Sequence, residues 1–301
     1  MKNKNFLFTF LFLTFISFSM RSQVEVSKLN DDDLTAFKAT TTYFILPEFD
    51  TDKKAQYEQT MKDAWTITPF KVLTAKEAES PEWKKDPLKI SKITLAGIIS
   101  DEPIGEYTAN LVVTMFYYRR DKLIEKQVAS SPVAFANGIS YNPQLSQDEL
   151  TVIENKKNDY THYSPGFIKG YLMAINGYLV KNLGRGFRSS ETDKEEAAKA
   201  LQGTLYIPQY IIDATTNKNL LAKAKFKYQV VPTAEMDVKI LKGGETFYYL
   251  DCSRIYKTKM ITIINASTGK IVCSIFSVPA GGLDAHSFNS DDVDALNKFK
   301  K

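Results

Sequence analysis

The sequence predicts an α/β protein made of two tandem copies of one module, each with the element order β-α-β-α-β-β-β-α and a mixed sheet covered by helices. Three observations support this prediction. Residues 259–276 alternate as a half-buried β-hairpin requires, and residues 111–130 repeat the pattern. The other elements precede both hairpins in the same order. A strongly apolar segment, 167–180, separates the two copies.

The amino terminus has the pattern of a secretory signal peptide. Lys2 and Lys4 precede an apolar run, 6–18, which is too short to span a bilayer comfortably. We expect cleavage near Ser22 and an exported protein; an uncleaved membrane anchor is the alternative. Removing residues 1–22 lowers the formal net charge from +4 to +1, because Lys2, Lys4 and Arg21 are lost. A nearly neutral chain argues against nucleic-acid partners.

The first module is expected at 28–157. Thr and aromatic residues at 40–47 favour a strand that ends at Pro47, because proline cannot donate to a ladder. Asp31-Asp32-Asp33 is interpreted as a helix amino terminus. The remaining predicted elements are a helix at 53–65, a strand at 70–73, a short helix within 74–92, strands at 93–99, 106–118 and 123–130, and a helix at 147–156.

A connecting region, 158–190, contains the apolar helix 167–180, whose apolar residues surround it almost completely. We expect this helix to be buried between the two modules; a docking face for another chain is the alternative. Gly170 and Gly177 are seven residues apart on nearly one face, so we expect both to permit close approach by another element.

The second module is expected at 191–301. Its turn at 267–270 places Gly269 where a tight turn needs a positive φ. The other predicted elements are helices at 195–201, 219–226, 234–241 and 290–298, and strands at 203–208, 228–231 and 245–252.

Both copies contain a strand closed by proline, FILP at 44–47 and LYIP at 205–208, and the second has the hairpin IINASTGKIV at 263–272. In these features the repeated unit resembles the periplasmic α/β module shared by the curli secretion protein CsgG, the penicillin-binding-protein activator LpoB and the amino-terminal domain of TolB. The resemblance implies a role in envelope assembly. The first copy departs from it at the turn, where Arg-Arg-Asp-Lys stands at 119–122.

No catalytic constellation is recognisable. The two histidines, His162 and His286, lie in polar, loop-like contexts without a nucleophile motif. No His/Cys spacing fits zinc, and the acidic run 31–33 lacks the glycine and distal glutamate of a calcium loop. We therefore expect no cofactor and no metal. A pair of carboxylates that meet only in the folded chain is left open.

Cys252 and Cys273 are the only cysteines. A meander that sets Cys273 opposite Ile264, and Ile264 opposite Tyr248, leaves Cys252 four residues away, roughly 13 Å. That separation predicts two free thiols. A thioredoxin-like arrangement is left open, without a Cys-x-x-Cys motif to support redox chemistry.

These patterns favour an exported, non-enzymatic interaction or assembly-accessory protein of the bacterial envelope, with an envelope or cell-surface protein as its partner. The alternative is an exported hydrolase or small-ligand-binding protein with a site between the modules. The candidate contact residues are Arg119 and Arg120 at the first hairpin turn and Tyr117 and Tyr118 beside it, because cations next to aromatic rings suit an acidic or aromatic surface. A solvated turn with core tyrosines is the alternative.

Overall fold

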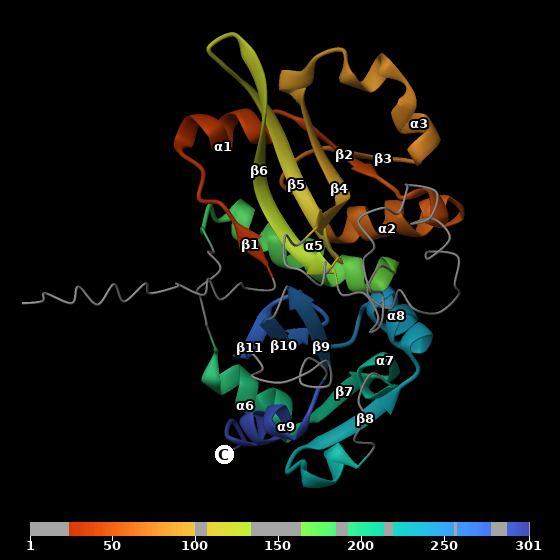
Figure 1. The fold of residues 1–301 in the computed structure, drawn as a ribbon, viewed down its shortest axis with the longest axis vertical. Coiled ribbons are helices and arrows are strands. Elements are labelled where there is room, and N and C mark those ends of the chain that lie inside the picture. Colours follow the sequence, from red (N-terminus) through yellow and green to blue (C-terminus); the bar gives the residue numbers. More distant parts are fainter. Residues whose placement is uncertain are drawn as a thin grey trace, which may run out of the picture.

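The chain folds into two mixed β-sheets, one from each half of the sequence (Figure 1). The computed structural model describes residues 24–99, 107–133, 164–184, 192–213, 219–255, 258–277 and 288–300. The first sheet has the order β1-β6-β5-β4-β2-β3, with β1 at Glu25–Val26, β2 at Thr41–Ile45, β3 at Phe70–Leu73, β4 at Ile90–Ile99, β5 at Tyr107–Arg119 and β6 at Lys122–Val133. The second has the order β11-β10-β9-β7-β8, with β7 at Thr204–Pro208, β8 at Lys227–Val231, β9 at Tyr248–Ile255, β10 at Thr258–Asn265 and β11 at Ile271–Ser277.

The two sheets have the same topology, which confirms the predicted fold class. β2 pairs in parallel with β3 and β4, as β7 does with β8 and β9. β4, β5 and β6 form an antiparallel meander, as do β9, β10 and β11. Only β1 has no counterpart in the second sheet as described. It was not predicted from the sequence, because two residues are too few to show alternation.

The helices of the first half begin at side-chain caps. Asn30 accepts a hydrogen bond from the Asp33 N–H at the start of α1 (Asp31–Lys38), and the acidic first turn suits the helix dipole, as predicted. Thr74 and Glu77 form a capping box on α3 (Ala75–Glu79). The other helices here are α2 (Lys54–Ala64) and the 3₁₀ turns η1 (Glu48–Lys53), η2 (Pro81–Lys84) and η3 (Pro87–Lys89).

The second half corrects one predicted helix. Residues 219–226 form only a single 3₁₀ turn, η4 (Leu220–Lys223). Asn297 accepts a hydrogen bond from the Lys225 N–H at 2.8 Å and donates to the Lys223 carbonyl at 3.0 Å, so these backbone groups bond to another helix instead of extending their own. The other helices are α6 (Lys194–Gln202), α7 (Gln209–Asp213), α8 (Thr233–Lys242) and α9 (Ser290–Asn297).

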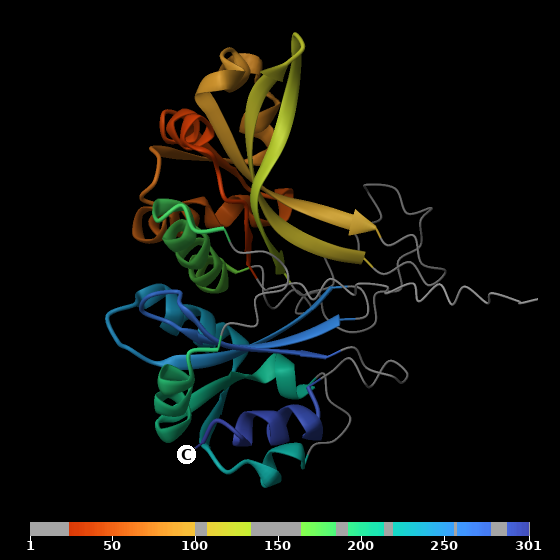
Figure 2. The ribbon, with the colours of Figure 1, turned by 90° about the vertical axis from the view of Figure 1, so that its left-hand side faces the viewer.

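An apolar row crosses all six strands of the first sheet. Its members lie opposite one another from strand to strand, and each is at most 5% exposed: Val72, Phe44, Ile93, Val113, Ala129 and Val26. The row continues into a core with α2 and the connecting helix, which lie along one face of the sheet (Figure 2). This burial explains why one strand register is favoured, since a slip by one residue would turn the row toward the other face.

The connecting helix, α5 (Pro165–Val180), lies between the two sheets, as predicted (Figure 2). Lys169, which is 6% exposed, ties it to both halves: its Nζ lies 2.8 Å from an Asp63 carboxylate oxygen in α2 and 3.0 Å from the Leu241 carbonyl in α8. One hydrophobic core therefore includes residues of both halves. On the far face of the second sheet, a separate core packs against α6, α9 and η4.

The two glycines of α5 behave differently. A Cβ on Gly170 would lie 2.4 Å from the Tyr249 hydroxyl, so a side chain here would displace that tyrosine and the predicted close approach is confirmed. A Cβ on Gly177 would meet nothing within 4 Å, so the predicted close approach is wrong there. Helical spacing shows that two residues share a face, but not how far along the helix a neighbour extends.

Both cysteines are free, although their register differs from the predicted one. Cys273 lies opposite Ile263, because a β-bulge shifts the ladder between Ile263 and Ile264. Ile263 lies opposite Leu250, so Cys252 is two residues, about 7 Å, along the sheet and also two strands, about 10 Å, across it. A disulfide requires Cα atoms within ~7 Å, so the thiols stay apart.

Two of the predicted elements lie outside the described residues. They are the signal peptide at 1–22 and the helix at 147–156, which would close the first module.

Candidate partner-contact site

The β5–β6 hairpin carries all four predicted contact residues and projects beyond the rest of its sheet (Figure 1). Arg119 pairs with Lys122, which leaves a two-residue turn. Its central residues, Arg120 and Asp121, have φ values of 49° and 58°, as a type I′ turn requires. Non-glycine residues rarely adopt positive φ, which explains why the sequence showed a turn here but not its type.

The two tyrosines face opposite sides, as strand alternation predicts. Tyr118 is 58% exposed and lies opposite Leu123, which is 42% exposed. The pair next to the turn is Arg119 with Lys122, and Tyr118 with Leu123 is the next pair along the hairpin. In this second pair the opposing side chains lie close together. Tyr117 lies opposite Ile124 and is half-buried. The tip therefore presents a small apolar surface made of Tyr118 and Leu123.

Cations follow this apolar pair at the turn. Arg119, Arg120 and Lys122 are exposed beside Asp121, which gives the tip an excess of two positive charges. None of them forms an ion pair with another residue of the described part of the chain. Arg119, Arg120 and Tyr118 are therefore all exposed at the tip, but strand alternation puts Arg119 on the same face as the half-buried Tyr117 and Tyr118 on the opposite face.

The corresponding hairpin of the second half is docked against α5. Gly269 has a φ of 65°, as predicted, and a Cβ there would lie 2.4 Å from the Met173 Cβ and 2.9 Å from the Gly170 carbonyl oxygen. Only glycine fits so close to a helix backbone. The β10–β11 turn is therefore part of the contact between the halves, whereas the β5–β6 turn is free of such packing.

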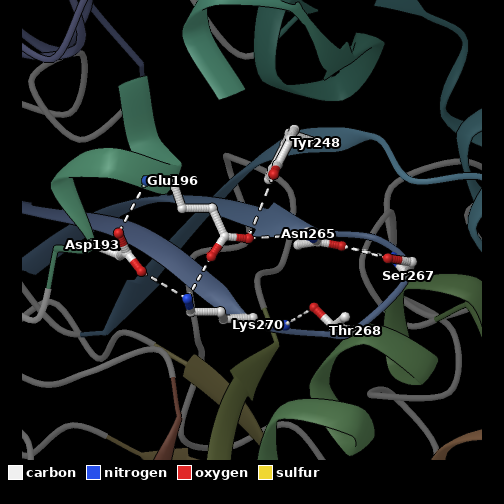
Figure 3. A network of polar contacts seen from close by, with 7 residues as sticks. All are labelled: Asp193, Glu196, Tyr248, Asn265, Ser267, Thr268 and Lys270. Carbon is white, nitrogen blue, oxygen red and sulfur yellow. Dashed lines mark hydrogen bonds and ion pairs between the residues drawn. The ribbon is translucent and has the colours of Figure 1, made fainter. Parts of the chain in front are cut away.

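An ion-pair network holds the docked hairpin to the start of α6 (Figure 3). Lys270 donates to the carboxylates of Asp193, at 2.8 Å, and Glu196. Glu196 also accepts a hydrogen bond from the Asn265 amide at 3.1 Å, and Asp193 caps α6 by accepting from the Glu196 N–H. The network therefore joins a helix amino terminus to the two ends of the hairpin turn, Asn265 in β10 and Lys270 just before β11.

The pKa shifts in this network oppose proton transfer near neutral pH. Hydrogen bonds to Asp193 and Glu196 hold the pKa of the Lys270 ammonium above its usual range. The pKa of Asp193 is lowered, chiefly by the Glu196 N–H and then by Lys270. Burial acts to raise the pKa of Glu196, but hydrogen bonds from Lys270 and Asn265 lower it overall. All three groups stay ionised, so the network is suited to holding structure and not to acid–base catalysis.

A second carboxylate lies where the alternative hypothesis places an active site, between the two halves. Asp251 is fully buried and accepts hydrogen bonds at 2.9 Å from the hydroxyls of Tyr171 in α5 and Tyr210 in α7. Burial, followed by the charge of Asp251, raises the pKa of Tyr210 well above its usual range. Tyr210 is therefore a neutral donor, and the two hydrogen bonds to Asp251 join α5 and α7 to β9.

The described residues contain no group of three or more His, Cys, Asp or Glu side chains placed to bind a metal. His162 and His286 lie outside the described residues, so their predicted loop settings are untested. Among the described helices, none has the length and apolar character needed to cross a membrane.

Sequence reasoning missed the network around Lys270. Asp193 and Glu196 have the spacing of a capping box, which marks a helix start. That signal does not show that Glu196 reaches the hairpin, because the partners Asn265 and Lys270 are about 70 residues away.

Comparisons of the chain with protein-family models, with curated proteins and with solved structures found no match. The function is therefore inferred from the residues of this chain.

Proposed function

We propose that this chain is an exported, non-enzymatic interaction protein of the bacterial envelope, and that it binds a partner protein through the tip of the β5–β6 hairpin. One observation carries the proposal. Of two topologically equivalent hairpins, one packs Gly269 of its turn against α5 and the other leaves its tip exposed, with Tyr118 opposite Leu123 and exposed cations at the turn. Exposed aromatic and arginine side chains are the types that most often anchor protein interfaces.

Two further features support the proposal. The buried carboxylates of Asp251 and Asp292 and the half-buried one of Asp237 each make hydrogen bonds or ion pairs within the fold, so they hold elements together. The amino-terminal pattern and the resemblance to the CsgG, LpoB and TolB modules favour the envelope as the location. Export is tested by sequencing the amino terminus of the mature protein, which we expect near Gln23.

The contact is tested by site-specific photocrosslinking in the native cell. A benzophenone amino acid in place of Tyr118 should crosslink a defined partner, and one in place of Tyr228 should not. Tyr228 is the matched control because it is 41% exposed on β8 of the other sheet. Purified partner should then bind Tyr118→Ser, and the double variant Arg119→Ser with Arg120→Ser, at least about tenfold more weakly, which corresponds to ~1.4 kcal/mol.

These changes should alter the free energy of unfolding by no more than ~0.5 kcal/mol, because the side chains are exposed. A loss of binding in a normally folded variant would therefore support the site. Unchanged partner binding by both variants would remove it.

A further inference from the structure

A groove runs along the free edge of the first sheet. It is formed by residues within 54–73 and does not include the hairpin tip. Its volume is about 590 Å³, and it lies between α2 and the edge strand β3. One face of α2 forms one wall with Lys54, Ala55, Glu58, Gln59 and Lys62. The four residues of β3, Phe70 to Leu73, form the other wall.

The strand β3 presents backbone groups along this groove. The carbonyls of Pro69 and Leu73 accept hydrogen bonds from Thr42 and Leu46, each at 2.8 Å, so they face the neighbouring strand β2. Backbone groups of alternate residues in a strand point to opposite edges. Phe70 and Val72 therefore direct their N–H and C=O groups away from β2, where no described strand pairs with them.

The groove is also electropositive. Three lysines and one glutamate are among its lining residues. Lys54 is engaged, since its Nζ lies 2.8 Å from the Glu77 carboxylate and its hydrogen bond is the main cause that lowers the pKa of Glu77 to about 2. Lys62 and Lys71 make no ion pair with another described residue. Lys62 and Lys71 thus remain available beside the free backbone groups, and together with Glu58 they give the lining an excess of one positive charge.

We infer that this groove binds an extended, acidic peptide segment, which adds to β3 as a further strand. Its backbone would pair with Phe70 and Val72, and its acidic side chains would lie near Lys62 and Lys71. Strand addition of this kind derives its affinity from main-chain hydrogen bonds and its specificity from side-chain pockets. Lys71 on the edge disfavours pairing with the same strand of a second copy, because like charges would face each other.

Among the described elements of the second half, no helix as long as α2 stands in the equivalent place. The place of α2 between β7 and β8 is taken by the five-residue α7 and the four-residue η4. The groove is therefore specific to the first half among the described elements, and the edge strand β8 supplies a control surface within the same molecule.

The inference is tested with the full chain and a fluorescein-labelled peptide of sequence Val-Glu-Val-Glu-Val-Glu, measured by fluorescence polarisation. The acidic peptide should bind at least about tenfold more tightly than its Val-Lys counterpart. N-methylation of alternate amides should weaken binding by at least about tenfold, because it removes main-chain donors while the charge is kept. The peptide should also shift the amide NMR signals of Phe70 and Val72.

Charge reversal tests the position of the site. The double variant Lys62→Glu with Lys71→Glu should bind the acidic peptide at least about tenfold more weakly. The control, Lys223→Glu with Lys227→Glu, reverses two exposed lysines at and before β8 and should bind as the unchanged protein does.

The inference is overturned if the acidic peptide shows no saturable binding up to ~1 mM. Equal affinity for the N-methylated peptide, or for the Lys62 and Lys71 variant, would overturn it as well. The Tyr118→Ser variant should bind the peptide normally, so this site and the hairpin tip can fail independently.

Discussion

Asp237 of α8 caps the amino terminus of α5, although the two residues that meet there are 71 positions apart in the chain. Its Oδ1 accepts a hydrogen bond from the Gly166 N–H at 2.6 Å, and the Ser164 hydroxyl donates to the same oxygen. Ser164, the residue at the N-cap position, makes no side-chain cap bond itself. The helix that separates the two sheets thus takes its cap from the second half of the protein.

Removing this cap should destabilise the protein. We expect Asp237→Ala to lower the free energy of unfolding by about 1–2 kcal/mol, because orphan N–H groups at the start of α5 lose their acceptor. The measurement is urea unfolding followed by circular dichroism. Ser290→Ala, at the first position of α9, is a control, since Asn289 provides the cap of that helix. An effect of Asp237→Ala no larger than that of the control would contradict the assignment.

The same carboxylate should introduce a pH dependence. Burial is the largest cause that raises the pKa of Asp237 above its ordinary value of 3.8. The folded state therefore binds a proton more readily than the unfolded state does, and this group's contribution to stability falls as the pH rises from 3.8 through the folded pKa. We expect Asp237→Asn to remove this loss of stability with rising pH. Between pH 4 and 7 the unchanged protein should lose unfolding free energy relative to Asp237→Asn as the pH rises; parallel profiles would count against the assignment.

Substituting Gly269 should separate the docked hairpin from α5. We expect Gly269→Ala to cost more than about 2 kcal/mol, because positive φ and contact with a helix backbone act together. Gly244→Ala is the matched control: its φ is 83°, but a Cβ there meets nothing within 4 Å. That variant should lose only about 1 kcal/mol, by thermal or chemical unfolding. Similar losses of unfolding free energy in the two variants would show that the hairpin is not packed closely against α5.

Replacing only one partner of the ion pair between Lys259 and Asp292 should lower the free energy of unfolding substantially. The two residues are 1% and 3% exposed, and their charged atoms lie 2.6 Å apart. Lys259→Met should cost about 3 kcal/mol, because it leaves a buried carboxylate unpaired. Adding Asp292→Asn should recover part of that loss, since the amide oxygen can still accept from the Asn289 N–H. A double variant less stable than Lys259→Met alone would refute this account.

The free thiols should resist modification in the folded protein. Burial raises the pKa of Cys273 to about 11 and that of Cys252 beyond its usual range. At pH 8 only about one Cys273 side chain in a thousand is a thiolate, the reactive form. Neither cysteine should therefore react rapidly with a disulfide reagent until the protein unfolds, and both should react then. A non-reducing peptide map that contains a Cys252–Cys273 disulfide would contradict the observed strand order.

Local patterns in the sequence determined the repeated order of strands and helices. Alternation identified both hairpins, the glycine at 269 marked a turn with positive φ, and the acidic run at 31–33 marked a helix start. The all-round apolar character of 167–180 also predicted a helix between two bodies. These features depend on neighbouring residues, so the sequence alone was sufficient to predict them.

Only the tertiary structure decided which surfaces are free. Two hairpins with similar patterns differ in their surroundings, because Gly269 contacts α5 whereas Arg120 and Asp121 are exposed. The groove beside β3 depends on strand order, which places β3 at an edge, and on the length of α2. The helix expected at 219–226 is short because Asn297 bonds its backbone from a distant helix. Each outcome depends on partners remote in sequence, and single-sequence periodicity carries no information about them.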